Sequence, residues 1–111
     1  IACQATDKSL SILIPVVLKH NGAILITADH GNAEELKNLE TGEIDTEHSV
    51  NPVPLWFITP DNHREKSTDE MVREQNEIRG LLSDVAPTIL DLMEIKKPTE
   101  MNGTSLLKLF Q

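Results

Sequence analysis

Apolar residues recur at helical spacing near the start of the chain. Five of them lie three or four positions from one another: Leu10, Leu13, Ile14, Val17 and Leu18. This spacing predicts an amphipathic helix over residues 7–19. Thr6 is placed to cap its start, and Asn21-Gly22 is a typical C-terminal stop. Pro15 falls inside this helix, so we expect a kink or a restart there, because proline removes a backbone hydrogen bond.

Two short apolar runs are typical of buried β-strands. Residues 23–28 and 53–58 are almost continuously apolar and rich in branched or aromatic side chains. Such runs suit strands that are covered on both faces. We interpret Trp56 and Phe57, in the second run, as core residues. Both strands are predicted to belong to a mixed or parallel sheet.

The rest of the chain alternates polar segments with one further helix. Residues 61–76 carry charges of both signs without a period and indicate a loop, and residues 77–80 are predicted to form a short edge strand. Ser83 or Asp84 is expected to begin a helix with Pro87 in its first turn, where proline is tolerated. The predicted buried stripe of this helix consists of Val85, Ile89, Leu92 and Met93. A C-terminal apolar docking patch is predicted at Leu106, Leu107, Leu109 and Phe110.

The order of these elements defines a fold class. Helix, strand, loop, strand and helix together are typical of an α/β sandwich. Two strands are few for such a fold, because a mean sheet has about five or six. We therefore predict a partial sandwich, the edge of a larger mixed sheet with flanking helices. The chain begins with Ile1 rather than Met, and we interpret it as a piece of a longer polypeptide.

Composition narrows the possible partners. Ten Lys and Arg stand against 18 Asp and Glu, for a net charge of −8, which disfavours nucleic acids and anionic lipids. The longest apolar stretches, residues 10–18 and 52–58, are far shorter than the roughly 20 residues of a membrane-spanning helix. Cys3 is the one cysteine, and these residues contain no basic segment followed by an apolar segment and a small-residue cleavage site, the pattern of a secretory signal. We expect a cytoplasmic protein that binds neither nucleic acid nor membrane.

The residues with the clearest chemistry follow the first predicted strand. In Thr27-Ala28-Asp29-His30-Gly31-Asn32, a carboxylate and an imidazole come directly after a buried strand, where open α/β sheets place their ligands. His48 lies just before the second predicted strand. Asp29, His30 and His48 together predict a site for a divalent ion such as Mn²⁺, with Zn²⁺ and Co²⁺ as alternatives. The simpler alternative is that Asp29 and His30 only cap a helix or hydrogen-bond within a loop.

Longer motifs carry a family resemblance. The run from Leu25 to Glu34, which contains Asp-His-Gly-Asn-Ala-Glu, is followed by His-Ser-Val-Asn-Pro-Val-Pro over residues 48–54. Further matching segments are Gly80 to Leu92 and Met101 to Leu106. Together they resemble the 2,3-bisphosphoglycerate-independent phosphoglycerate mutases, which are members of the alkaline phosphatase superfamily.

The resemblance implies a function and a division of roles. These enzymes interconvert 3-phosphoglycerate and 2-phosphoglycerate through a phosphoserine intermediate at two divalent metal ions, and they need no 2,3-bisphosphoglycerate. Mn²⁺ is the expected metal, with Mg²⁺, Co²⁺ or Zn²⁺ as alternatives. By resemblance, Asp29 and His30 map onto ligands of the ion that also binds the serine, and His48 maps onto a ligand of the other ion. Two metals suit this reaction because they neutralise charge on the transferring phosphoryl group.

Several parts of the family pattern are not found in these 111 residues. The serine nucleophile, the transferase domain and the N-terminal half of the phosphatase domain have no counterpart here, so no catalytic residue is assigned and the substrate-binding residues stay unknown. We interpret residues 1–111 as the C-terminal portion of the metal-binding phosphatase domain, part of a glycolytic enzyme that is a monomer when whole. The isolated piece is expected to be inactive and prone to self-association.

Two other functions stay open. One is a different metalloenzyme of the same superfamily, such as a phosphopentomutase or a phosphatase, although the segment from His48 to Pro54 disfavours it. The other is a noncatalytic acidic module that associates with a partner through its apolar C-terminal patch and an uncovered sheet edge.

Overall fold

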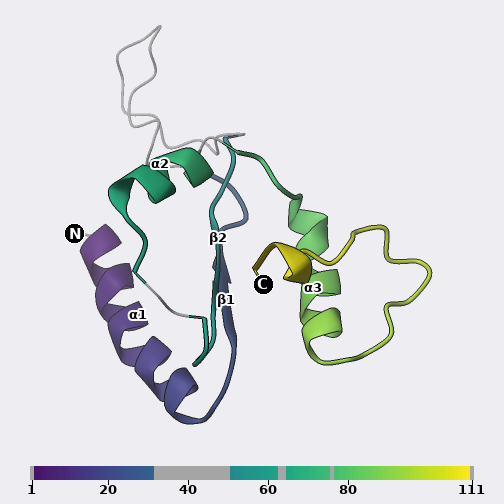
Figure 1. Ribbon diagram of the computed structural model, residues 1–111, viewed down its shortest axis with the longest axis horizontal. Helices are drawn as coiled ribbons and strands as arrows, with labels where there is room; N and C mark the ends of the chain where they lie inside the picture. Colours follow the sequence, from purple (N-terminus) through teal and green to yellow (C-terminus); the bar gives the residue numbers. More distant parts are fainter. Residues whose placement is uncertain (1, 32–50, 63–64, 76, 111) are drawn as a thin grey trace, which may run out of the picture. The chain divides into compact units, whose positions relative to one another are not determined.

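The computed structural model describes residues 2–31, 51–62, 65–75 and 77–110 of the chain (Figure 1). The chain divides into two compact units, Ile1–Met71 and Val72–Gln111. Helices and a small sheet occur together, as a partial α/β fold requires. None of the helices in the described part of the chain is both long and apolar enough to span a bilayer.

Helix α1 spans Ala2–Lys19 and runs through Pro15 as one continuous element (Figure 1). It begins earlier than the apolar spacing predicts, because Ala and Gln, strong helix formers, extend it toward the N-terminus. The predicted cap at Thr6 is therefore wrong. The Thr6 hydroxyl lies inside the helix and donates to the Ala2 carbonyl at 3.3 Å. The predicted restart at Pro15 is also wrong.

The end of α1 confirms the predicted stop. Asn21 takes the left-handed conformation, with a φ of 54°. The Gly22 amide donates to the Val17 carbonyl at 3.0 Å, and the Asn21 amide donates to the Leu18 carbonyl at 3.0 Å. These two bonds form a Schellman motif, which satisfies carbonyls that the helix end leaves unpaired. The chain then reverses into the first strand.

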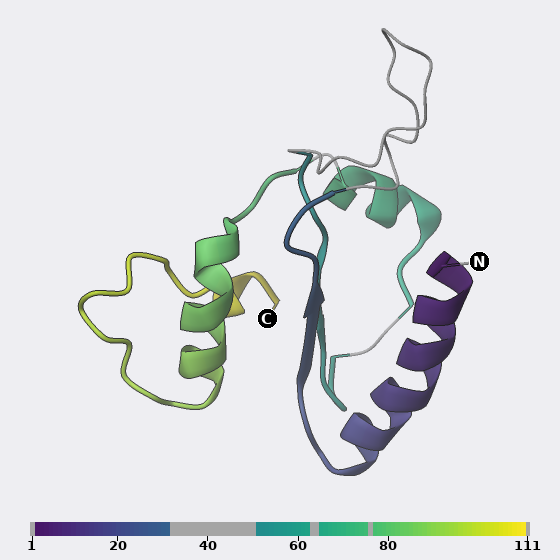
Figure 2. The ribbon, with the colours of Figure 1, turned by 180° about the vertical axis from the view of Figure 1, so that it is seen from behind.

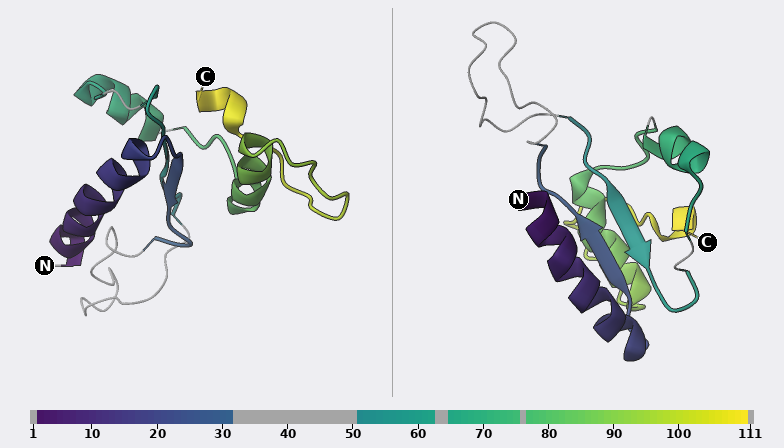
Figure 3. Two further views of the ribbon diagram at one scale, coloured as in Figure 1. Left: turned by 90° about the horizontal axis from the view of Figure 1, so that it is seen from below. Right: turned by 90° about the vertical axis from the view of Figure 1, so that its left-hand side faces the viewer.

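Strands β1 (Ile24–Thr27) and β2 (Leu55–Ile58) form a two-stranded antiparallel sheet, which is seen edge-on in Figure 2 and from its face in the right-hand view of Figure 3. Ile24 pairs with Ile58, and Thr27 pairs with Leu55. Both predicted strands are confirmed, but the prediction that they are covered on both faces is wrong, because their residues are half-buried or exposed. A parallel pairing of the two strands is also excluded. The prediction of Trp56 as a core residue is wrong, because 53% of it is exposed. Phe57, the other residue interpreted as core, is half-buried.

Helix α2 (Thr68–Gln75) corrects the prediction of a loop over residues 61–76. Its start is fixed by Ser67 and Glu70. The Glu70 carboxylate accepts a hydrogen bond from the Ser67 amide at 2.9 Å, and the Ser67 hydroxyl accepts one from the Glu70 amide at 3.3 Å. This reciprocal pair is a capping box, which stabilises a helix that has little apolar periodicity.

The second unit is built around helix α3 (Val85–Leu92), which follows the short 3₁₀ helix η1 (Leu82–Asp84). Pro87 lies in the first turn of α3, as predicted. Residues 77–80 form no strand in the structure, so that prediction is wrong. The predicted buried stripe is also only partly correct: Val85 and Leu92 are half-buried, while Ile89 and Met93 are 40% and 60% exposed.

A second 3₁₀ helix, η2 (Leu107–Phe110), carries most of the predicted docking patch (Figure 3). Leu106, Leu107 and Phe110 are half-buried, whereas Leu109 is 49% exposed. The patch is therefore partly engaged within its own unit. No large apolar side chain in the described ranges is fully buried.

Polar groups hold the C-terminal segment against the start of α3. The Asp84 carboxylate, only 7% exposed, accepts hydrogen bonds from the Thr104 amide at 2.8 Å and the Leu81 amide at 2.9 Å. The bond from Thr104, and to a smaller extent the bond from Leu81, lowers the pKa of the Asp84 carboxyl below its ordinary value of 3.8. Burial has the opposite effect on this pKa but does not outweigh the two bonds. The fully buried Thr88 donates to the Asp84 carbonyl at 2.7 Å and accepts from the Leu106 amide at 2.9 Å.

Gly103 completes this attachment. A Cβ at this position would lie 2.1 Å from the Ser83 carbonyl oxygen, so the backbone approaches η1 more closely than any other residue allows. The sequence suggested that Asp84 caps α3 through its side chain, but the structure shows no such bond. The Asp84 side chain instead binds the segment that packs over the start of the helix.

Candidate metal centre

Asp29 and His30 lie just beyond the end of β1, where the sequence places them. Ala28 alone separates Asp29 from the last strand residue, Thr27. The Thr27 hydroxyl donates to the carbonyl of Pro54, the residue before β2, at 2.9 Å. The same end of the sheet thus carries both the Asp29-His30 pair and the entry to β2.

The two side chains point toward one another. His30 Nε2 lies 3.6 Å from Asp29 Oδ1, and the side chains are 35% and 88% exposed, respectively. The other ring nitrogen, Nδ1, lies 2.9 Å from the Gly31 carbonyl oxygen. Because a carbonyl can only accept, this contact assigns the proton to Nδ1. In the neutral ring, Nε2 then carries the lone pair that a metal ion needs.

This geometry fits a shared cation. Two ligand atoms that each lie about 2.1 Å from one ion are roughly 3.0–3.4 Å from each other when the ligand–metal–ligand angle lies between the octahedral and the tetrahedral value. The observed 3.6 Å between Nε2 and Oδ1 needs only a small rotation to reach that range. A carboxylate and an imidazole also suit Mn²⁺, Co²⁺ and Zn²⁺.

The complete predicted site cannot be assembled from the described residues. His48 lies outside them, so its convergence with Asp29 and His30 stays a prediction. Within the described ranges, no group of three or more His, Cys, Asp or Glu side chains is arranged to hold a metal ion. The structure therefore brings two of the three predicted ligands together.

Thr27 is a residue of this region that the sequence analysis did not single out. A threonine at a strand end is unremarkable by itself, since β-branched residues favour strands. The sequence signal for its role was Pro54, because a proline has no N–H to donate to a neighbouring strand. The Pro54 carbonyl instead accepts a hydrogen bond from the Thr27 side chain of the neighbouring strand.

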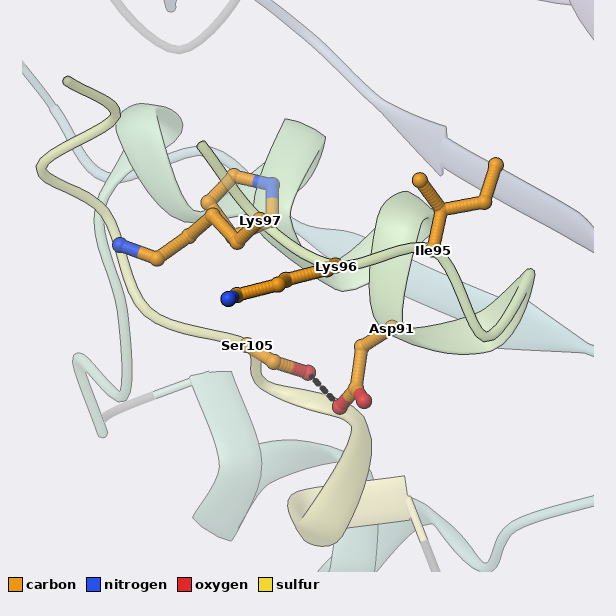
Figure 4. A pocket seen from close by; sticks show the side chains of 6 residues that line it. Asp91, Ile95, Lys96, Lys97 and Ser105 are labelled. Atoms are coloured by element: carbon orange, nitrogen blue, oxygen red, sulfur yellow. Dashed lines mark hydrogen bonds between the residues drawn. The ribbon is translucent and has the colours of Figure 1, made fainter. Parts of the chain in front are cut away.

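A separate shallow pocket of about 270 Å³ lies in the second unit (Figure 4). Its lining consists of Pro87, Asp91, Ile95, Lys96, Lys97 and Ser105. The Ser105 hydroxyl donates to Asp91 at 2.5 Å and accepts from the Leu107 amide at 3.2 Å. Lys97 donates to the carbonyls of Met101 and Gly103. The Ser105 hydroxyl thus joins the C-terminal segment to the Asp91 carboxylate of α3, so Ser105 has a structural explanation and is not assigned as a nucleophile.

Comparison with known proteins identifies the family. The model of the metalloenzyme superfamily matches residues 1–97. The chain belongs to this superfamily. The match includes β1, β2 and the Asp29-His30 pair, so the donor geometry described above occurs in a family named for its metals.

Individual relatives within the superfamily have a more specific name. The chain is 45% identical over 106 residues to the 2,3-bisphosphoglycerate-independent phosphoglycerate mutase of Ruthia magnifica subsp. Calyptogena magnifica. It is 44% identical to the mutase of Acetivibrio thermocellus and 42% identical to that of Clostridioides difficile. Each alignment covers 96% of this chain but only 18–19% of the relative. The chain thus spans about a fifth of the length of these mutases.

Proposed function

We propose that this chain is the C-terminal part of a 2,3-bisphosphoglycerate-independent phosphoglycerate mutase. In the complete enzyme it would supply Asp29 and His30 to one divalent metal ion and His48 to a second. The observation that carries this proposal is the paired Asp29 and His30 donors at the end of β1, 3.6 Å apart, in a chain that aligns over 96% of its length with mutases.

The proposed roles follow from the chemistry of the side chains. Asp29 contributes a negative charge and an oxygen ligand, and His30 contributes a neutral nitrogen ligand whose ring is oriented by the Gly31 carbonyl. When bound, the metal ions would neutralise charge on the phosphoryl group of 3-phosphoglycerate or 2-phosphoglycerate. The nucleophilic serine and the groups that clamp the substrate would come from other parts of the enzyme.

The exposure of apolar side chains in the first unit also supports this proposal. Four large apolar residues of the first unit are at least half exposed: Ile12 at 64%, Leu13 at 50%, Val16 at 52% and Trp56 at 53%. Such exposure is expected where further segments of a longer polypeptide would pack.

The test is an activity assay on the full-length protein. We expect interconversion of the two phosphoglycerates without added 2,3-bisphosphoglycerate, its loss on chelation, and its return with Mn²⁺. Asp29→Asn and His30→Gln should each lower activity by at least about 100-fold, because loss of even an outer-shell partner of a metal ligand costs about 10- to 100-fold.

Matched controls come from the same unit. Asp7→Asn and His20→Gln change an exposed aspartate and an exposed histidine in and just after α1, outside the predicted ligand set, and should leave activity unchanged. Turnover of a different phosphorylated substrate and not of phosphoglycerates would instead assign the protein to another metalloenzyme of the superfamily. Full activity in Asp29→Asn would contradict the proposed ligand role.

The exposed apolar residues also favour a second candidate, a noncatalytic module that associates with itself. Both candidates predict self-association of the 111-residue chain, so metal binding distinguishes them: the second candidate predicts no metal binding by the full-length protein. Metal-dependent turnover would exclude it as the main function.

A further inference from the structure

The Thr27 hydroxyl connects the end of β1, which leads to Asp29 and His30, to the segment that enters β2. It donates to the Pro54 carbonyl at 2.9 Å, and its distance to the Ala28 carbonyl is 3.4 Å. A hydroxyl has one hydrogen, so the shorter contact, which crosses from β1 to the chain entering β2, is the principal bond. Asp29 follows Thr27 by two residues along the chain.

The position of Pro54 explains why a side chain is needed. The paired register ends with Thr27 opposite Leu55, so the next pair would place Ala28 opposite Pro54. Pro54 has no backbone N–H, and it cannot donate to the neighbouring strand. The Thr27 hydroxyl supplies a cross-strand bond at the point where the regular ladder ends.

We propose that Thr27 is a positioning residue for the metal centre. By binding Pro54, it fixes the end of β1 against the segment of residues 51–54, and so sets where Asp29 and His30 begin. This inference rests on the proposed function for its metal, while the cross-strand bond itself is independent of it.

The first test measures the bond without metal. Hydrogen exchange of the metal-free, full-length protein would be compared for the wild type, Thr27→Val and Thr27→Ser. Thr27→Val keeps the shape of the side chain but removes the hydroxyl, and it should accelerate exchange of the amides of residues 26–28 and 55–56 by roughly 2- to 12-fold, the equivalent of one net hydrogen bond. Thr27→Ser keeps the hydroxyl and should stay within about twofold of the wild type.

The second test measures Mn²⁺ affinity by calorimetry. Thr27→Val should weaken binding by about 10-fold, in the range seen when groups that orient metal ligands are lost, and Thr27→Ser should restore it. Thr6→Val is the matched control, because it removes a similar exposed hydroxyl-to-carbonyl bond within α1 and should change neither measurement.

The outcomes separate the two proposals. Failure of the wild type to bind Mn²⁺ would contradict the proposed function, and the exchange measurement would still decide whether Thr27 fixes the strand end. Binding of Mn²⁺ with equal affinity by the wild type, Thr27→Val and Thr27→Ser would overturn the positioning role and leave the proposed function standing. Equal exchange rates in all three proteins would overturn the cross-strand bond as well.

Discussion

Thr88 offers a test of how the C-terminal segment is held. Its side chain is fully buried, and its hydroxyl makes two hydrogen bonds, to the Asp84 carbonyl at 2.7 Å and from the Leu106 amide at 2.9 Å. Thr88→Val preserves the volume of the side chain but removes both bonds. The Leu106 amide is then left without its acceptor, while the Asp84 carbonyl keeps the bond that a helix N-cap carbonyl accepts.

The magnitude follows from the burial of these groups. Leaving a buried donor unpaired costs about 1–3 kcal/mol, and the partial burial of the Leu106 amide favours the lower part, about 1–2 kcal/mol. Thr88→Ser has a different cost, because it keeps the hydroxyl and removes one buried methyl group, at about 0.8–1.5 kcal/mol. The two variants therefore lose similar amounts of stability, but only Thr88→Val leaves the Leu106 amide without its hydrogen bond.

Site-resolved hydrogen exchange distinguishes them. In the full-length protein, Thr88→Val should accelerate exchange of the Leu106 amide by roughly 5- to 30-fold, which corresponds to about 1–2 kcal/mol. Thr88→Ser should change the exchange rate of the Leu106 amide no more than it changes the exchange rates of the neighbouring amides in α3. Unchanged protection of Leu106 in Thr88→Val would refute the role of this hydroxyl in attaching the segment.

Three further substitutions test the same unit. Asp84→Asn should remove part of the loss of stability on acidification. Because folding lowers the pKa of Asp84, its carboxylate stabilises the fold above pH 3.8, and this stabilisation is lost as the pH falls through the lowered pKa. Denaturation curves of the wild type and the variant at several pH values check this. Gly103→Ala should destabilise the unit, since the new Cβ would lie 2.1 Å from the Ser83 carbonyl, and a lower urea midpoint would show it. Glu94→Gly should stabilise it by about 0.5–1 kcal/mol in the same assay, because Glu94 has a φ of 56° that glycine adopts without strain; a lower midpoint would contradict this.

The sequence predicted the elements that depend on apolar periodicity or on turn residues. The two strands, the end of α1 at Asn21-Gly22 and the place of Pro87 in α3 are all confirmed. Each depends on residues that are close together in the chain, so local patterns are enough to locate it.

The errors have local physical causes as well. Helix α2 was missed because its residues lack apolar periodicity, although Ser67 and Glu70 have the spacing of a capping box. The predicted strand at residues 77–80 had apolar and charged residues in alternation, but four residues of alternation are too short a pattern to form a strand without a ladder, and none forms there. The roles of Asp84 and Thr88 depend on contacts with residues 104 and 106, and such distant contacts leave no periodic signal.

The candidate site was predictable only in part for a related reason. Asp29 and His30 are adjacent in sequence, so a motif at the end of a strand was enough to pair them. The contribution of Thr27 requires the register of β1 against β2, which the sequence did not provide.

The most direct test of the account is a crystal structure of the full-length protein with Mn²⁺, recorded with anomalous scattering from the metal. We predict one anomalous peak within coordination distance of both His30 Nε2 and the Asp29 carboxylate, and a second peak bound by His48. Anomalous peaks that lie away from Asp29 and His30, or no peak at saturating Mn²⁺, would contradict the claim that this chain supplies ligands to a metal centre.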